Sequence, residues 1–193
     1  MAPAERYASQ RIAEILDKSR LGIIAGTGHL PRQIAERFDP SGKTIFFIAL
    51  EGITDPKTVI NFDHKWAKLG QLQIAMTALL DAKVDKVVMA GPVKRPAMSS
   101  LKLDKRASKM LLRGGVKVFG DDGLLSLLIK EMEKDGLKVI GIDQILSDLL
   151  TEPDLTIGPP VDDMAQKDIY RALVILVMLG PGDVGDSVGI QDG

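Results

Sequence analysis

LGIIAGTGHLP, residues Leu21–Pro31, joins a short apolar run to a loop with two glycines and then to a proline. The apolar and partly β-branched residues Leu21–Ala25 predict a strand that is covered on both faces. Gly26 and Gly28 predict a sharp turn in which the backbone comes close to a ligand, because neither residue has a Cβ. Pro31 predicts the first helical position, where its missing N–H is no loss.

The loop between this strand and this helix is a candidate phosphate site, because the free N–H groups of a helix N-terminus attract anions. It consists of Gly26, Thr27, Gly28, His29, Leu30 and Pro31. A nicotinamide-binding loop is an alternative, although that fingerprint requires a third glycine, or alanine, where Pro31 stands. A turn that binds no ligand is the other alternative.

Strand and helix patterns alternate along the following part of the chain. Asp39–Gly42 and Asp55-Pro56 predict turns, His64–Trp66 predicts a short strand or surface segment, and Asp104 and Asp143 are predicted to cap helices. The alternation predicts an α/β fold with a Rossmann-like, mainly parallel sheet and helices on both faces. Further strands are predicted at residues 44–50, 87–90, 116–119 and 139–142, and helices at residues 31–38, 70–82, 104–112, 124–135 and 145–150.

Ligands of such sheets bind beyond the carboxyl ends of the strands, so the loops after residues 25, 90 and 119 are predicted to converge. The second of these loops contains Gly91, Lys94, Arg95 and Pro96. Arg95 could bind a phosphate with two parallel hydrogen bonds, while Lys94 acts as a point charge. The alternative is a solvated basic loop.

Two neighbouring carboxylates, Asp121 and Asp122, lie in the third loop. They could bind a Mg²⁺ ion that bridges phosphates, or they could cap the helix that follows, and capping is the favoured interpretation for Asp122. His29 could donate to a phosphate, but local hydrogen bonding is the more common role of a single histidine at a helix entry. The sequence has no Ser/His/Asp arrangement, HExxH motif or Walker lysine in the first loop.

The composition is that of an ordinary globular protein. Of the 193 residues, 45% are hydrophobic and 26% are charged, and none is cysteine, which excludes disulfides and thiolate ligands. The first twenty residues lack the apolar core of a signal peptide, so a cytoplasmic location is expected.

Residues 91–118 form a basic segment. They contain eight basic residues and one acidic residue, which sum to +7 in a chain whose net charge is −1. Such a field attracts polyanions, nucleotide phosphates or an acidic membrane surface, although a solvated helix face is the ordinary explanation. Four apolar residues of the segment are expected to pack in the core rather than contact lipid, namely Met98, Leu101, Leu103 and Met110.

Four parts are expected in the chain. Residues 1–19 form a helical extension, residues 20–150 the α/β domain, residues 151–160 a proline-rich linker, and residues 161–193 the start of a second α/β domain. In the last part, a helix at residues 161–179, capped by Asp162, is so apolar that it needs partners on more than one side, which a homodimer would provide. A strand at residues 187–191 and the turn Asp192-Gly193 would begin a hairpin.

Three stretches, in this order, resemble the UDP-2,3-diacylglucosamine pyrophosphatases of the LpxI type, from lipid A biosynthesis. They are LGIIAGTGHLPRQIAE, KVVMAGPVKRPAMSSLKLD and VFGDDGLLSLLIKEMEKDGLKVIGIDQIL. The closing stretch, GPGDVGDSVGIQDG, is similar to the family's entry into its C-terminal domain. The resemblance extends from about Arg20 to Gly193.

This resemblance implies two α/β domains with the substrate between them, and Mg²⁺-dependent hydrolysis of UDP-2,3-diacylglucosamine to UMP and 2,3-diacylglucosamine 1-phosphate. The implied partner is a nucleotide-activated glycolipid, and no nucleic acid is expected. The basic segment, from Lys94 to Lys117, could in addition make a peripheral contact with the surface of the inner membrane. The glycine loop, the basic loop and Asp121-Asp122 stand where the family has its own glycine loop, basic loop and acidic turn. The family's catalytic aspartate belongs to a C-terminal domain that would follow Gly193, so an inactive fragment is expected. A nicotinamide-dependent oxidoreductase and a non-catalytic nucleotide-binding module are the alternatives.

Overall fold

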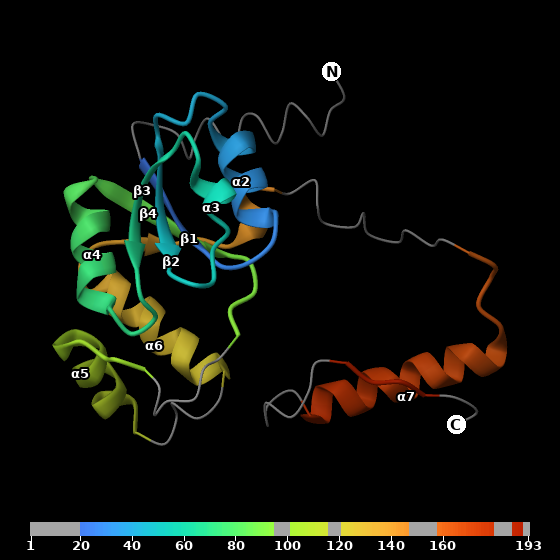
Figure 1. The fold of residues 1–193 in the computed structure, drawn as a ribbon. Helices are drawn as coiled ribbons and strands as arrows, with labels where there is room; N and C mark the ends of the chain where they lie inside the picture. Colours follow the sequence, from blue (N-terminus) through green and yellow to red (C-terminus); the bar gives the residue numbers. More distant parts are fainter. Residues whose placement is uncertain (1–19, 95–100, 116–120, 147–157, 180–186, 191–193) are drawn as a thin grey trace.

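A five-stranded parallel sheet forms the centre of the protein (Figure 1). The computed structural model describes residues 20–94, 101–115, 121–146, 158–179 and 187–190. The strand order is β3-β2-β1-β4-β5, so the predicted parallel α/β fold is confirmed. The strands are β1 (Arg20–Ala25), β2 (Ile45–Leu50), β3 (Asp63–Ala67), β4 (Val84–Ala90) and β5 (Lys138–Val139).

Helices cover both faces of this sheet, and each face has its own hydrophobic core. On one face, α2 (Leu30–Phe38), the short helix α3 (Pro56–Val59) and the 3-10 helix η3 (Ile142–Gln144) surround a core that includes Ile34, Phe38, Phe47 and Ile145. On the other face, α4 (Leu72–Asp81), α5 (Lys105–Gly114) and α6 (Asp121–Glu133) contribute Met76, Leu79, Met110 and Met132.

Gly22 allows α4 to pack closely against the central strand. A Cβ at Gly22 would lie 2.7 Å from Cδ2 of Leu79 and 2.9 Å from Cγ1 of Val84. Both distances are far below van der Waals contact, so a larger residue would push α4 away from β1. The second core therefore depends on a glycine inside β1.

Several predicted elements have different bounds in the structure. Asp55 caps the short helix α3 and does not merely mark a turn, because a proline follows it at the first helical position. Asp143 lies inside η3 and caps no helix, and the predicted strand at residues 139–142 ends at Val139. His64–Trp66 does form a strand, as part of β3.

Other predictions concern the ends of the chain. The described residues 187–190 contain no strand, so the prediction of one at residues 187–191 is wrong there. The predicted helix in residues 1–19, the strand at residues 116–119 and most of the predicted linker lie outside the described residues.

The apolar helix predicted after the linker is present as α7 (Asp163–Leu179). Asp162 caps it as predicted, accepting hydrogen bonds from the N–H groups of Met164 at 3.1 Å and Ala165 at 2.8 Å. None of its side chains is buried, and Val177 is 74% exposed. None of the helices among the described residues combines the length and the apolar character that crossing a membrane requires.

Asp39 ends α2 and holds the turn that leads into β2. Its carboxylate accepts hydrogen bonds from the N–H and hydroxyl of Ser41, at 2.9 and 2.6 Å, and from the N–H and hydroxyl of Thr44, both at 2.8 Å. Burial alone would raise the pKa of the Asp39 carboxyl, but these hydrogen bonds outweigh burial and lower the pKa to about 2. The turn predicted at Asp39–Gly42 is thus built around one carboxylate.

Asp39→Asn is expected to lower the free energy of unfolding near neutral pH by about 1–2 kcal/mol, because hydrogen bonds to a charged acceptor are lost. The pKa of Asp39 is lowered from 3.8 to about 2 in the folded protein. The stabilisation of the fold by the charged carboxylate is therefore complete above pH 3.8 and is lost as the pH falls towards 2. Urea unfolding over this pH range measures the effect, with the exposed carboxylate variant Asp85→Asn as the matched control. A difference from wild type that is constant with pH would contradict this account of Asp39.

Candidate phosphate-binding site

The carboxyl ends of β1 and β4 form the point at which the chain changes direction in the sheet. From β1 the chain builds β2 and β3 on one side, and it then crosses over to build β4 and β5 on the other side. In open parallel sheets, ligands bind outside the carboxyl ends of the strands at such a switch point. The loops that follow Ala25 and Ala90 border this point.

These two loops contact each other directly. The N–H of Gly26 donates to the carbonyl oxygen of Ala90 at 2.7 Å. The N–H and the hydroxyl of Thr27 both donate to the carbonyl oxygen of Pro92, at 2.9 and 3.0 Å. The predicted convergence is confirmed for these two loops, whereas Phe119, after which the third loop begins, lies outside the described residues.

Two glycines make this contact sterically feasible. A Cβ at Gly26 would lie 2.3 Å from the carbonyl oxygen of Gly91, and a Cβ at Gly91 would lie 2.3 Å from the carbonyl oxygen of Thr27. Gly91 also has a positive φ of 86°. The space in which a Cβ of Gly26 would lie is therefore filled by the backbone of Gly91, whereas binding of a ligand by Gly26 stays a prediction. Gly28, with φ 85°, has open space where its Cβ would be.

Thr54 fixes the loop ends from the other side of β1, and the sequence analysis missed it. Its buried hydroxyl donates to the carbonyl oxygen of Ala25 at 2.5 Å and accepts from the N–H of Leu50 at 2.8 Å. This one side chain joins the carboxyl ends of β1 and β2. A single polar residue in an aperiodic stretch gives no pattern from which the role could be predicted.

The N-terminus of α2, with its free backbone N–H groups, lies at the switch point. Thr27, Gly28 and His29 are exposed, and His29 precedes the helix without any side-chain cap. Among the described residues, none makes a hydrogen bond to the His29 imidazole. Leu30 is half-buried and begins the helix, so Pro31 is its second residue and is buried. An uncapped helix N-terminus with exposed approach residues can accept an anion.

The remaining predicted site residues lie on the neighbouring loops. Lys94 is exposed, four residues after the end of β4, whereas Arg95 and Pro96 lie outside the described residues. Asp121 and Asp122 are the first two residues of α6, which begins three residues earlier than predicted. Asp122 is therefore the second residue of the helix, and the prediction that Asp122 caps it is wrong.

A comparison with known protein families shows to which family the chain belongs. A family model, the LpxI N-terminal domain, matches residues 20–149, which is more than half of the chain. The chain belongs to the LpxI family. A curated relative, the UDP-2,3-diacylglucosamine pyrophosphatase LpxI of Caulobacter vibrioides, is 30% identical over 178 residues, or 90% of this chain. The chain spans 62% of that relative's length.

In this LpxI family member, the segment after β4 is fastened to the same edge of the sheet by Asp104. Its carboxylate caps α5 as predicted, accepting from the N–H of Ala107 at 2.8 Å, and it also accepts from the N–H of Gln73 at 2.6 Å. The N–H of Asp104 donates to the carbonyl oxygen of Gly70, which lies just after β3, at 3.0 Å. Asp104 thus holds the start of α5 at the carboxyl edge.

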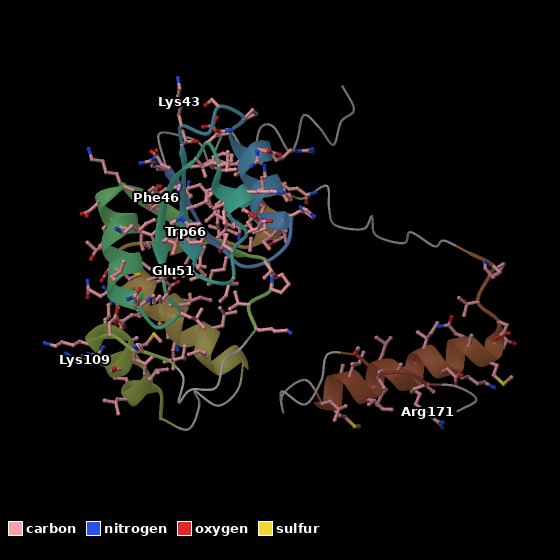
Figure 2. The ribbon with its side chains drawn as sticks, viewed as in Figure 1. Lys43, Phe46, Glu51, Trp66, Lys109 and Arg171 are labelled. Atoms are coloured by element: carbon pink, nitrogen blue, oxygen red, sulfur yellow. The ribbon has the colours of Figure 1, made fainter. Side chains whose placement is uncertain are left out.

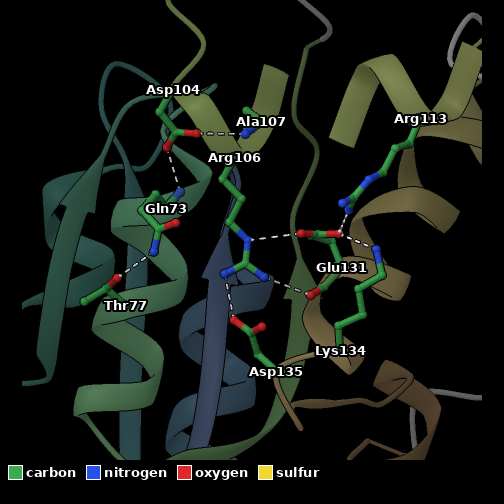
Figure 3. Close-up of polar contacts among 9 residues, drawn as sticks. All are labelled: Gln73, Thr77, Asp104, Arg106, Ala107, Arg113, Glu131, Lys134 and Asp135. Carbon is green, nitrogen blue, oxygen red and sulfur yellow. Dashed lines mark hydrogen bonds and ion pairs between the residues drawn. The ribbon is translucent and has the colours of Figure 1, made fainter. Parts of the chain in front are cut away.

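A largely buried ion network joins α5 to α6 (Figure 3). Arg106 donates from Nη1 to Asp135 at 2.7 Å, and its Nε lies 3.3 Å from the carboxylate of Glu131. Lys134 donates to Glu131 at 2.6 Å, and this hydrogen bond lowers the pKa of the Glu131 carboxyl. The hydrogen bond from Arg106 likewise lowers the pKa of Asp135. The network fixes which face of α5 points inwards.

Gly26→Ala is expected to destabilise the fold by about 3 kcal/mol, because the methyl group would overlap the backbone of Gly91 and neither loop can move freely. Gly28→Ala is the matched control and should cost about 1 kcal/mol, because only the left-handed backbone is strained. Urea unfolding of both variants measures the difference. Equal stabilities of the two variants would show that the loops do not touch.

Arg106→Met is expected to lower the free energy of unfolding by about 3–5 kcal/mol, because it removes the hydrogen-bond partner of Asp135 and the guanidinium that lies 3.3 Å from the buried carboxylate of Glu131. Arg113→Met, which removes a more exposed guanidinium 3.9 Å from the same carboxylate, should cost less than about 1 kcal/mol. Chemical denaturation of the two variants tests this ranking. Comparable losses would contradict the assignment of Arg106 as the central cation.

Proposed function

We propose that this chain binds the nucleotide pyrophosphate of UDP-2,3-diacylglucosamine and serves its hydrolysis to UMP and 2,3-diacylglucosamine 1-phosphate, a reaction of lipid A biosynthesis. The contact between the Gly26 and Gly91 loops carries the proposal, because it builds one rigid wall at the switch point of a sheet in the LpxI family. The curated relative's name supports the choice of substrate.

The chemistry of the wall suits phosphate oxygens. Backbone N–H groups at the start of α2 offer neutral donors, and Lys94 adds a positive charge from the adjacent loop. Arg95 is proposed to add a second charge. Such groups stabilise the negative charge that builds up on a phosphoryl group during displacement.

Water is the proposed nucleophile. The hydroxyl of Thr27, which lies in the glycine loop, donates to the carbonyl oxygen of Pro92 and is therefore engaged in loop packing. In the proposed step the water oxygen forms a bond to one phosphorus while the bridging P–O bond breaks. The leaving phosphate keeps the electron pair of that bond, and the water releases a proton.

Mg²⁺ is proposed as a cofactor because of the family resemblance. Among the described residues, no group of three or more histidine, aspartate or glutamate side chains could hold a metal ion. Asp121 and Asp122 have the hard oxygen donors that Mg²⁺ prefers.

A nicotinamide-dependent oxidoreductase is the second candidate, because the strand order of this sheet matches the first five strands of the dinucleotide-binding order 3-2-1-4-5-6. The buried Pro31 at the place of the third fingerprint glycine argues against it. Titration calorimetry with UDP and with NADH separates the two functions. Binding of NADH without binding of UDP would overturn the proposal.

Lys94→Ala is expected to weaken UDP binding about tenfold, because it removes one charged partner of the phosphates. Lys43→Ala, an exposed lysine before β2 at the opposite edge of the sheet, is the control and should leave binding unchanged. Release of UMP from UDP-2,3-diacylglucosamine, followed with and without MgCl₂, tests the reaction itself. If the chain neither binds UDP nor releases UMP, the proposed function is wrong.

A further inference from the structure

We propose that the outward face of α5 docks on an anionic lipid bilayer. This cationic face consists of Lys102, Lys105, Lys109, Leu112 and Arg113. The inference rests on the proposed function, because it identifies the surface on which a glycolipid substrate would be met. It adds a partner and a docking surface to the site at the switch point.

Helical spacing gathers these side chains into one row. Lys105, Lys109 and Arg113 follow one another at intervals of four residues, and Leu112 lies beside Lys109 at an interval of three. The opposite side of the helix carries Met110, which is only 7% exposed. Leu112 is 83% exposed, so the outward row combines cations with an uncovered apolar side chain.

Three of the four cations of this face are not balanced within the described part of the chain, whereas Arg113 lies 3.9 Å from the carboxylate of Glu131. Lys102, Lys105 and Lys109 make no ion pair with any described residue. The neighbouring carboxylates already have partners: Asp104 accepts from two backbone N–H groups, and Glu131 binds Arg106 and Lys134. The cationic face therefore presents an open positive field, which matches an anionic lipid surface.

Among the described residues 101–111, the packing of the basic segment keeps three apolar residues of this segment away from the surface, whereas Met98 lies outside the described residues. Met110 is in the core and Leu103 packs against the same core, as predicted from the sequence. Leu101 is half-buried. Leu112 is thus the one exposed large apolar side chain among the described residues of α5, and binding to a bilayer would be mainly electrostatic.

The position of α5 places this face near the carboxyl edge of the sheet, where the candidate phosphate site lies. Asp104 ties the start of the helix to Gly70, just beyond the carboxyl end of β3. The Gly26 and Gly91 loops lie at the carboxyl ends of the same sheet. Figure 2 shows Lys109 at the end of the domain opposite to Lys43. A bilayer on α5 would face the edge at which the nucleotide head group is proposed to bind.

Flotation with vesicles tests the proposal on the full 193-residue chain. The chain is expected to float with vesicles of phosphatidylcholine and phosphatidylglycerol in equal parts, but not with phosphatidylcholine alone. High salt should abolish this binding. Lys105→Glu/Lys109→Glu should weaken it by at least about 30-fold, and Leu112→Ser should weaken it less.

Lys43→Glu/Lys138→Glu is the matched control, because it makes the same change of net charge at exposed positions near the amino ends of β2 and β5. It should bind vesicles as the wild type does. Glutamate at position 105 lies in the first turn of α5 and suits the helix dipole. Glutamate at position 109 would stand four residues before Arg113, a spacing that favours an ion pair, so the test variant should keep the melting temperature of the wild type.

Several results would overturn the proposal. The two double variants could bind anionic vesicles equally well, or binding could be independent of lipid charge. Either result would assign the contact to another surface, such as the exposed apolar side chains of α7. Binding of single-stranded RNA without binding of anionic vesicles would assign the face to nucleic acid. If the chain binds UDP but not vesicles, only the proposed docking surface is wrong. If it binds vesicles but not UDP, the proposed function is wrong and the docking surface is retained.

Discussion

The backbone contact between Gly26 and Gly91 is the constraint on which the candidate site depends. A Cβ on Gly26 would lie 2.3 Å from the carbonyl oxygen of Gly91, and a Cβ on Gly91 would lie 2.3 Å from the carbonyl oxygen of Thr27. Because the carbonyl oxygens of Ala90 and Pro92 accept hydrogen bonds from the same loop, the contact is polar as well as tight. The loops after β1 and β4 therefore form a single wall, and the exposed N-terminus of α2 is set beside it.

A second set of polar contacts fixes the surroundings of that wall. Asp104 fastens the start of α5 to the carboxyl edge, while Arg106 binds the carboxylates of Glu131 and Asp135 on its inner side. Buried ion pairs contribute more to a unique arrangement than to net stability. Here the arrangement decides which charges of a basic helix are neutralised internally and which remain open to a partner.

The backbone and the side chains thus provide different groups of the candidate site. The backbone of the glycine loops gives shape and N–H donors, whereas Lys94 provides a described charged group on the adjacent loop. Membership of the LpxI family gives this arrangement a chemical context. The same edge of the sheet also carries the outward row of α5, so substrate binding and surface docking would occur on one side of the domain.

The sequence alone determined the strands around the glycine and basic loops, the alternation of strands with helices, and the helix caps Asp104 and Asp162, because periodicity and capping are local properties. Tertiary structure decided what those loops do. Thr27 and Pro92 are 65 residues apart, and no local pattern indicates that they meet. For the same reason the packing role of Gly26 and the buried hydroxyl of Thr54 emerged only when the strand order placed β1 between β2 and β4.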